Sequence, residues 1–198
     1  MEISAGMVRE LRDKTNAGMM DCKQALQQTD GDMNKAIDLL RQKGLATAMK
    51  RAGKEASEGI VHAYIHGGGR MGVLLEVNCE TDFAAKSQDF QEFVKNVAMQ
   101  IAAANPLGVT KEDVPQDVVE RERAIYLAQA QESGKPANIL EKMVDGKLRK
   151  FFQEVVLLEQ TYVKDPDKTI QDYLNELLAK TGEKIIIRRF VRFQLGGE

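Results

Sequence analysis

Few side chains in this sequence have both the type and the spacing that chemistry requires, and two histidines are the first candidates. His62 and His66 are four residues apart, a spacing that brings two imidazoles to one metal ion when both lie on a helix. The residues around them alternate between apolar and polar types, which is typical of a strand, and four strand residues span roughly 13 Å. We therefore interpret both histidines as surface residues and predict no metal site.

The other candidates for catalysis are equally weak. The three glycines at 67–69 lie between two predicted antiparallel strands and lack the Gly-Lys-Ser/Thr ending of a phosphate loop. Cys79 lies close to Glu80 and Asp82, whose negative charges disfavour the thiolate that a nucleophile needs. The arginines of 188–192 alternate with apolar residues, which favours a sheet edge or salt bridges to a partner over nucleic acid. The sequence predicts neither an enzyme nor a cofactor.

Composition restricts the class of protein. The 198 residues are 43% hydrophobic and 29% charged, enough for a folded core. Basic and acidic residues nearly cancel, with 28 against 30, so the cationic surface typical of nucleic-acid binding is not expected. No apolar run approaches the roughly 20 residues of a membrane span, and no signal segment is evident. We expect a cytoplasmic protein whose partner is another protein.

The elements that position these residues begin with three short helices in residues 4–43. Apolar residues recur there at three-to-four spacing, and turns are predicted at 17–18 and 30–32. A cationic, helix-biased connector follows over 46–54, with Gly44 and Gly53 as expected breaks. We predict an N-terminal domain of residues 1–54 and a second domain of residues 55–198.

The second domain starts with a change to period two. Val61, Ala63 and Ile65 alternate with polar residues, and the same pattern returns after the glycines, which predicts a hairpin over 58–79 with one buried face. Later segments predict helices at 84–104, 117–132, 137–160 and 169–181 and a strand at 184–195, with a turn at 133–136. The prediction is an α+β fold in which helices pack on a small three-stranded antiparallel sheet. Cys22 and Cys79 fall on different units and are expected to be reduced.

Two stretches resemble the signatures of the elongation factor Ts family. Residues 11–26 read LRDKTNAGMMDCKQAL and are similar to the first signature. Residues 76–86 read EVNCETDFAAK and are similar to the second, except that Ala84 stands where a valine is more usual. The resemblance extends to 134–136 and 189–193. It implies an N-terminal module similar to ubiquitin-associated domains, followed by an α+β core.

The resemblance also implies a function and its residues. Members of this family are guanine nucleotide exchange factors for the GTPase elongation factor Tu, and they promote GDP release by perturbing its magnesium and phosphate site. The implied contacts with that site are Thr81, Asp82, Phe83 and Ala84. The implied docking residues of the N-terminal module are Leu11, Arg12, Gly18, Met19 and Met20. The implied partner is elongation factor Tu, GDP-bound or nucleotide-free, with no direct contact to nucleic acid or membrane.

Several of these residues have structural interpretations as well. Thr81 or Asp82 could cap the helix that follows the hairpin. Phe83 precedes Phe90 by seven residues, so spacing alone predicts a core residue. For Met19 and Met20, we expect one to lie in the core and the other at the contact.

Two questions about the whole protein stay open in the sequence. A ubiquitin-associated-like adaptor without exchange activity is the alternative function, although it leaves the second signature unexplained. A homodimer is possible, because longer family members carry two related halves in the core and this chain has room for one. The predicted sheet, with apolar residues and uncovered edges, is a plausible dimer face.

Overall fold

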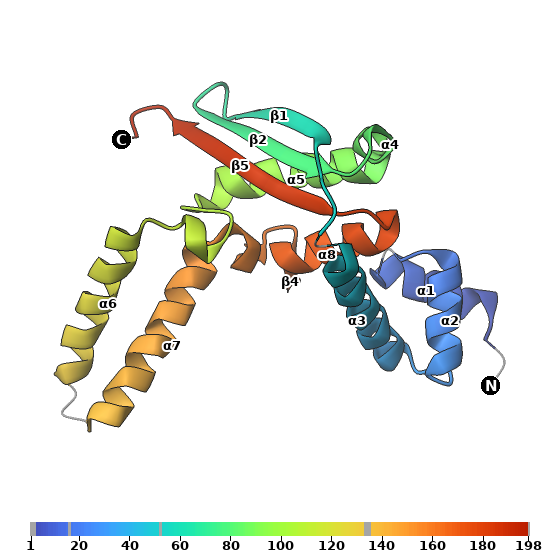
Figure 1. The fold of residues 1–198 in the computed structure, drawn as a ribbon, viewed down its shortest axis with the longest axis horizontal. Helices are drawn as coiled ribbons and strands as arrows, with labels where there is room; N and C mark the ends of the chain where they lie inside the picture. Colours follow the sequence, from blue (N-terminus) through green and yellow to red (C-terminus); the bar gives the residue numbers. More distant parts are fainter. Residues whose placement is uncertain (1–2, 16, 52, 133–135, 198) are drawn as a thin grey trace. The chain divides into compact units, whose positions relative to one another are not determined.

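The computed structural model describes residues 3–15, 17–51, 53–132 and 136–197, and it confirms the predicted α+β class (Figure 1). The strands are β1 (Glu58–His66), β2 (Met71–Cys79), β3 (Thr161–Tyr162), β4 (Asp165–Thr169) and β5 (Ile185–Gln194). The α-helices are α1 (Ala5–Thr15), α2 (Met19–Gln28), α3 (Met33–Arg51), α4 (Asp82–Lys86), α5 (Gln88–Ala104), α6 (Gln116–Gln131), α7 (Ala137–Val155) and α8 (Ile170–Thr181). None of the described helices is long and apolar enough to cross a membrane.

The chain divides into two compact units. The first comprises residues 1–61, 76–95 and 172–187, and the second comprises residues 62–75, 96–171 and 188–198. The boundary near residue 54, and with it the domains 1–54 and 55–198, stays a prediction.

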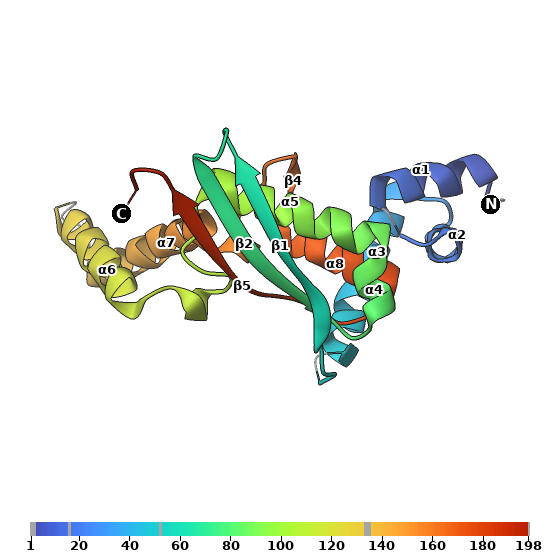
Figure 2. The same cartoon turned by 90° about the horizontal axis from the view of Figure 1, so that it is seen from above.

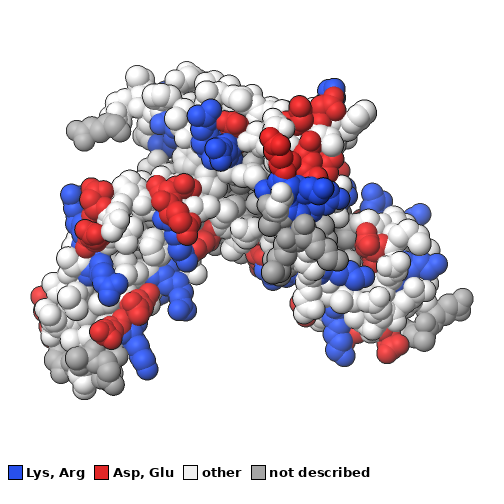
Figure 3. Space-filling view, in the orientation of Figure 1, with Lys and Arg blue, Asp and Glu red and all other residues white. Residues whose placement is uncertain are grey.

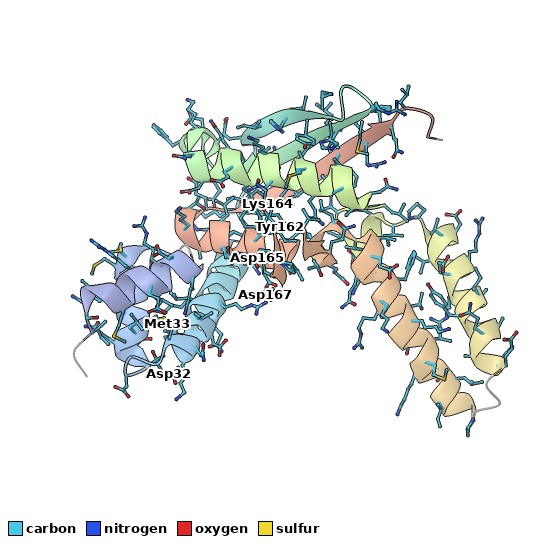
Figure 4. The ribbon with its side chains drawn as sticks, turned by 180° about the vertical axis from the view of Figure 1, so that it is seen from behind. Asp32, Met33, Tyr162, Lys164, Asp165 and Asp167 are labelled. Atoms are coloured by element: carbon cyan, nitrogen blue, oxygen red, sulfur yellow. The ribbon has the colours of Figure 1, made fainter. Side chains whose placement is uncertain are left out.

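In the first unit, α1, α2 and α3 form the predicted three-helix module. Leu11, Cys22 and Leu26 are fully buried at its centre. Asp32 ends the second turn, and its side chain accepts a hydrogen bond from the Lys35 amide at 3.0 Å, which caps the start of α3 (Figure 4).

The expected helix break at Gly44 is wrong. Helix α3 continues through Gly44 to Arg51. A Cβ at residue 44 would lie 3.5 Å from Ala179 Cβ and 3.5 Å from Asn175 O, so the missing side chain lets α3 approach α8 closely. Gly44 was predicted to end a helix because glycine is a poor helix former, but in the structure it lies within α3 at the contact with α8.

The sheet has the strand order β1-β2-β5, and β1 and β2 form the predicted hairpin (Figure 2). The three turn glycines have φ values of 60°, 66° and 89°, in the left-handed region that glycine tolerates best. Near this turn, the Leu195 amide donates to Arg70 O at 2.8 Å, which fits an antiparallel β5.

Only part of the hairpin has the expected buried face. On β2, Val73 is 2% exposed and Leu75 is fully buried. On β1, however, Val61 and Ile65 are 64% and 66% exposed. Ile65 lies beside Gly72, on the face of β2 opposite to Val73. The expected burial of the apolar β1 residues is wrong because this edge strand turns them away from the core.

The helix predicted at 84–104 is two helices, α4 and α5, separated by Ser87. Ser87 has an extended backbone (φ −66°, ψ 144°). Its hydroxyl donates to Ala84 O at 2.7 Å and accepts from the Phe90 amide at 3.3 Å, so it closes one helix and starts the next.

In the second unit, α6 and α7 pack as a helical pair around Ala130, Val144 and Leu148. Residues 133–135 of the predicted turn between them lie outside the described residues. Helix α7 ends at Val155 rather than residue 160, because the chain then pairs with the loop at Gly108 and Val109. The amides of Leu157 and Leu158 donate to those two carbonyls.

The hairpin β3–β4 was not predicted. Polar contacts hold it: Lys164 Nζ, in the turn, donates to Asn96 Oδ1 at 2.7 Å, and at the start of β4 the Asp167 amide donates to Asp165 Oδ1 at 3.3 Å (Figure 4). Strands of two and five residues, the longer of which contains Pro166, give too little alternation to be recognised in a sequence.

Candidate functional site

The corner between β2 and α4 contains the four residues that the resemblance assigns to the partner. Thr81 is the N-cap of α4: its backbone is extended (φ −130°, ψ 154°) and its Oγ1 accepts a hydrogen bond from the Ala84 amide at 3.3 Å. Asp82 is the first helical residue, where a negative charge is favoured near unpaired amides. The capping role therefore belongs to Thr81.

Asp82 is held by Lys86, one helical turn later. Lys86 Nζ donates to Asp82 Oδ2 at 2.6 Å. This hydrogen bond, together with the charge of Lys86 and the amide of Phe83, lowers the pKa of Asp82. The same contact raises the pKa of Lys86. Both side chains are solvent-accessible, so the ion pair orients Asp82 and contributes little to global stability.

Phe83 is 82% exposed, so the burial that its spacing from Phe90 predicts is wrong. The break at Ser87 separates the two aromatic residues into different helices, and helical periodicity does not continue across it. The inward face of α4 is occupied by Ala84 and Ala85, which are 8% and 6% exposed. The phenyl ring thus projects from a corner whose other face is packed.

Cys79 lies beneath this corner and is fully buried. Its Sγ donates to Thr81 O at 3.1 Å. Burial raises the pKa of the Cys79 thiol, and the negative charge of Glu183 adds to the effect. The thiolate is disfavoured, as expected, but by burial and Glu183 rather than by Glu80 and Asp82.

Two carboxylates of this corner were not predicted from the sequence. Glu183 accepts hydrogen bonds from Thr81 Oγ1 at 2.6 Å and from the Thr81 amide at 3.1 Å. Glu80 accepts from the Lys184 amide at 2.6 Å and from Arg51 Nη1 at 2.8 Å. No local pattern indicates Glu183, because it is 102 residues away from Thr81 in the sequence.

The docking residues implied for the N-terminal module differ in exposure. Leu11 is fully buried, and Arg12 is exposed. Gly18 is the N-cap of α2, where a Cβ would lie 2.9 Å from Asp21 Oδ2. Met19 and Met20 are 44% and 66% exposed, so the expectation that one of them lies in the core is wrong. Cys22, Ala25 and Leu26 fill that core instead.

The surface charge fits the nearly balanced composition. Figure 3 shows acidic and basic side chains next to one another on the visible face, rather than a continuous basic surface. Several charged side chains of the described residues form ion pairs, among them Lys180 with Asp89, whose Nζ and Oδ1 are 2.6 Å apart. Of the strand arginines, Arg192 is turned inward, and its guanidinium donates to Ala102 O at 3.2 Å and 3.3 Å.

Comparison of the sequence with known proteins shows which family the chain belongs to. The family model described as "Elongation factor TS" matches residues 10–197. The chain belongs to the elongation factor Ts family. Elongation factor Ts of Syntrophobacter fumaroxidans is 80% identical over 198 residues, which cover 100% of this chain and 99% of that protein. Those of Desulfosudis oleivorans and Carboxydothermus hydrogenoformans are 64% and 63% identical over 194 residues, 98% of this chain and 98% and 89% of theirs.

Membership in this family makes the protein a translation elongation factor. Both stretches that carry the resemblance lie in the first compact unit. The second signature forms the corner at 81–84, where Thr81, Asp82 and Phe83 are exposed. The first signature forms part of the helical core and the start of α2, where Met19 and Met20 are exposed. Each signature thus contributes exposed side chains as well as buried ones.

Proposed function

We propose that this protein is a guanine nucleotide exchange factor for elongation factor Tu and acts by promoting GDP release. The observation that carries the proposal is Phe83: an aromatic side chain 82% exposed at the tip of a packed corner, inside the second signature of the family. An exposed aromatic ring of this kind is a typical anchor for a protein interface, because it buries a large area with few rotatable bonds.

Phe83 acts as a wedge in this proposal. The ring enters an apolar slot of the GTPase, while Asp82 approaches the groups that hold the magnesium ion and the β-phosphate. Weakening the magnesium contacts matters most, because the cation neutralises the phosphates that it bridges. Thr81 and Ala84 shape the corner, the first as the cap and the second on its packed side.

Exchange by this route is a coupling between two ligands. If binding of the factor raises the dissociation constant of GDP by some ratio, binding of GDP raises the dissociation constant of the factor by the same ratio. Each tenfold change in the dissociation constant corresponds to about 1.4 kcal/mol of coupling free energy. The protein therefore accelerates nucleotide release without setting the final ratio of bound nucleotides. Elongation factor Tu is the partner in both its GDP-bound and its nucleotide-free state. We place the protein in the cytoplasm with this partner.

The N-terminal module supplies docking affinity. Met19 and Met20 form an exposed apolar pair at the start of α2, and methionine adapts well to a partner surface. Arg12 offers a charge on the neighbouring helix α1. Gly18 has no Cβ that would clash with the Asp21 side chain at the start of α2. Leu11 is buried and contributes by packing the core of the module.

We also propose a homodimer formed through the sheet. In the second unit, Ile65, Leu74, Val191 and Phe193 are 66%, 47%, 47% and 72% exposed. They share one face: Ile65 lies beside Gly72, which alternates with Val73, and Arg192 points to α5 on the opposite face. A second copy of the same face would remove this apolar surface from water.

The test is the release of fluorescent GDP from elongation factor Tu, followed by stopped flow. We expect the wild-type protein to accelerate release and Phe83→Ala to lower the maximal rate about tenfold or more, roughly 1.4 kcal/mol of coupling. Because the ring is exposed, the free energy of unfolding should change by less than about 0.5 kcal/mol. Leu127→Ala, at a 41% exposed leucine of α6, is the matched control and should release GDP at the wild-type rate.

Two results would contradict the proposal. An unchanged rate with Phe83→Ala would remove the wedge. No acceleration by the wild-type protein would favour the ubiquitin-associated-like adaptor, which would bind peptides through the N-terminal module without any effect on nucleotide.

A further inference from the structure

Two neighbouring residues after α8 make reciprocal contacts with two neighbouring residues before α4. The Glu183 carboxylate accepts from the amide and the hydroxyl of Thr81, at 3.1 Å and 2.6 Å. In return, the Glu80 carboxylate accepts from the Lys184 amide at 2.6 Å. All four residues belong to the first compact unit.

The carboxylate of Glu183 determines how the Thr81 hydroxyl is oriented. Because the hydroxyl proton is directed at Glu183, a lone pair of Oγ1 is left for the amide of Ala84, which is the capping bond of α4. The carbonyl of Thr81 is also occupied, by Cys79 Sγ at 3.1 Å and the Ala85 amide at 3.3 Å. Thus every polar atom of Thr81 is bonded within the protein.

Helix α4 needs this support because it is only five residues long. A single turn of helix is not stable by its own hydrogen bonds, so contacts outside the helix must hold it. Ala84 and Ala85 supply apolar packing on one side. The exposed ring of Phe83 supplies none, and the contacts of Thr81 fix the N-terminal end of the helix.

Glu183 is itself held in place. It follows Gly182, which has φ 69° and ends α8 with a hydrogen bond to Leu178 O at 2.9 Å. Glu80 is 14% exposed at its side chain and also pairs with Arg51, which ties the segment to the end of α3. The Glu183 carboxylate therefore lies in a segment that is held before it by the end of α8 and after it by the hydrogen bond between the Lys184 amide and Glu80.

We propose that Glu183 is a positioning residue for nucleotide exchange: it clamps Thr81 so that α4 presents Phe83 and Asp82 in one fixed orientation. This inference rests on the proposed exchange function and adds a residue outside both signature stretches. In the docked complex, a fixed corner loses less conformational freedom when Phe83 inserts than a mobile corner does. The clamp therefore acts on the insertion step, and so on the maximal rate of GDP release, rather than on docking.

The test separates maximal rate from affinity. GDP release from elongation factor Tu is measured over a range of concentrations of wild type, Glu183→Gln, Thr81→Val and the double variant. Glutamine keeps the size of the side chain, but it replaces one of the two accepting oxygens by an NH2 group that donates, and it removes the charge. We therefore expect the maximal release rate to fall about fivefold, ~1 kcal/mol of charged hydrogen bonding. The half-saturating concentration should change less than the maximal rate.

Thr81→Val should behave like Glu183→Gln, and the double variant should be no more than about twofold slower than either, because both changes break one clamp. Thr81→Ser keeps the hydroxyl and should restore most of the rate. Glu92→Gln, an exposed carboxylate on α5, is the matched control and should retain the wild-type rate. In a readout independent of GDP, amide hydrogen exchange at Thr81 and Ala84 should accelerate in Glu183→Gln and stay unchanged in the control.

The outcomes are distinguishable. A wild-type protein that does not accelerate GDP release overturns the proposed function and this inference with it. An active wild type with an equally active Glu183→Gln, or unchanged exchange of the two amides, overturns the positioning role alone. A loss in Glu183→Gln that is confined to the half-saturating concentration also overturns it.

Discussion

Thr81 uses all of its polar atoms within the protein, whereas Phe83, two residues later, buries almost none of its ring. A cap residue and an exposed aromatic residue thus lie two positions apart. The polar contacts of the cap are all within the chain, whereas most of the ring is exposed to solvent. Single substitutions at the two positions should therefore have different consequences, in local order for Thr81 and in partner coupling for Phe83.

At the residue scale, the contact between Asp82 and Lys86 predicts the direction in which the pKa of Asp82 changes when Lys86 is replaced. Its pKa is lowered in the folded protein, chiefly by the hydrogen bond from Lys86, so the associated local stability is present above the ordinary carboxyl pKa of about 4 and is lost as the pH falls through the lowered value. We expect Lys86→Ala to shift the Asp82 titration upward, toward that ordinary value. Carboxyl NMR shifts recorded from neutral to acidic pH measure it.

Asp32 provides the internal control. Its pKa is also lowered, but chiefly by the Lys35 amide at the start of α3, far from Lys86 in the sequence. Its titration should be the same in both proteins. If Asp82 titrates identically with and without Lys86, the ion pair does not form in solution.

At the element scale, we expect replacement by alanine to have opposite effects on stability at two glycines. Gly146 lies inside α7, and a Cβ at this position would meet no atom within 4 Å, so Gly146→Ala should stabilise the helix by about 0.5–1 kcal/mol. Gly59 has φ 144°, and a Cβ there would lie 2.1 Å from Val77 O. Gly59→Ala should therefore destabilise the hairpin by about 3 kcal/mol or more.

Thermal unfolding followed by circular dichroism measures both changes. A higher midpoint for Gly146→Ala and a much lower midpoint for Gly59→Ala are expected. Equal effects of the two substitutions would mean that the close approach of β1 and β2 at Gly59 is not maintained.

The elements themselves were predictable where periodicity is strong and unpredictable where tertiary contacts decide. The β2 strand and the helices α5 and α8 follow their hydrophobic patterns. The break at Ser87 depends on two side-chain hydrogen bonds, and the continuation of α3 through Gly44 depends on the closeness of α8. Neither has a local signal. The spacing of Phe83 from Phe90 predicts burial only if one helix continues across Ser87, so the spacing argument fails at the missed break.

At the scale of the whole molecule, the resemblance implies which residues contact the partner, and this stays a prediction. It gives no indication of how those residues are held in the structure. Glu183, which clamps the corner, is remote in the sequence and could be recognised only in three dimensions.

A variant of the N-terminal module should weaken docking to elongation factor Tu without affecting the insertion of Phe83. Replacing both Met19 and Met20 by Asp removes an exposed apolar pair, and the core should remain intact because neither side chain is buried. We expect the half-saturating concentration for GDP release to rise about tenfold, roughly 1.4 kcal/mol of docking energy, while the maximal rate is kept. A lower maximal rate at saturation would mean that the module contributes to release itself.

The sheet face makes a prediction about assembly. Phe193 is 72% exposed on the same face of the sheet as Ile65, Leu74 and Val191. A charge in the middle of a symmetric apolar interface is buried twice, once for each copy. We expect light scattering to give a mass about twice the 22.1 kDa of one chain for the wild type and a single-chain mass for Phe193→Glu. Leu127→Glu introduces the same charge on α6 and should leave the dimer intact. A wild-type mass of 22.1 kDa at every concentration would exclude the dimer, and the exposed face would then require a different protein to cover it.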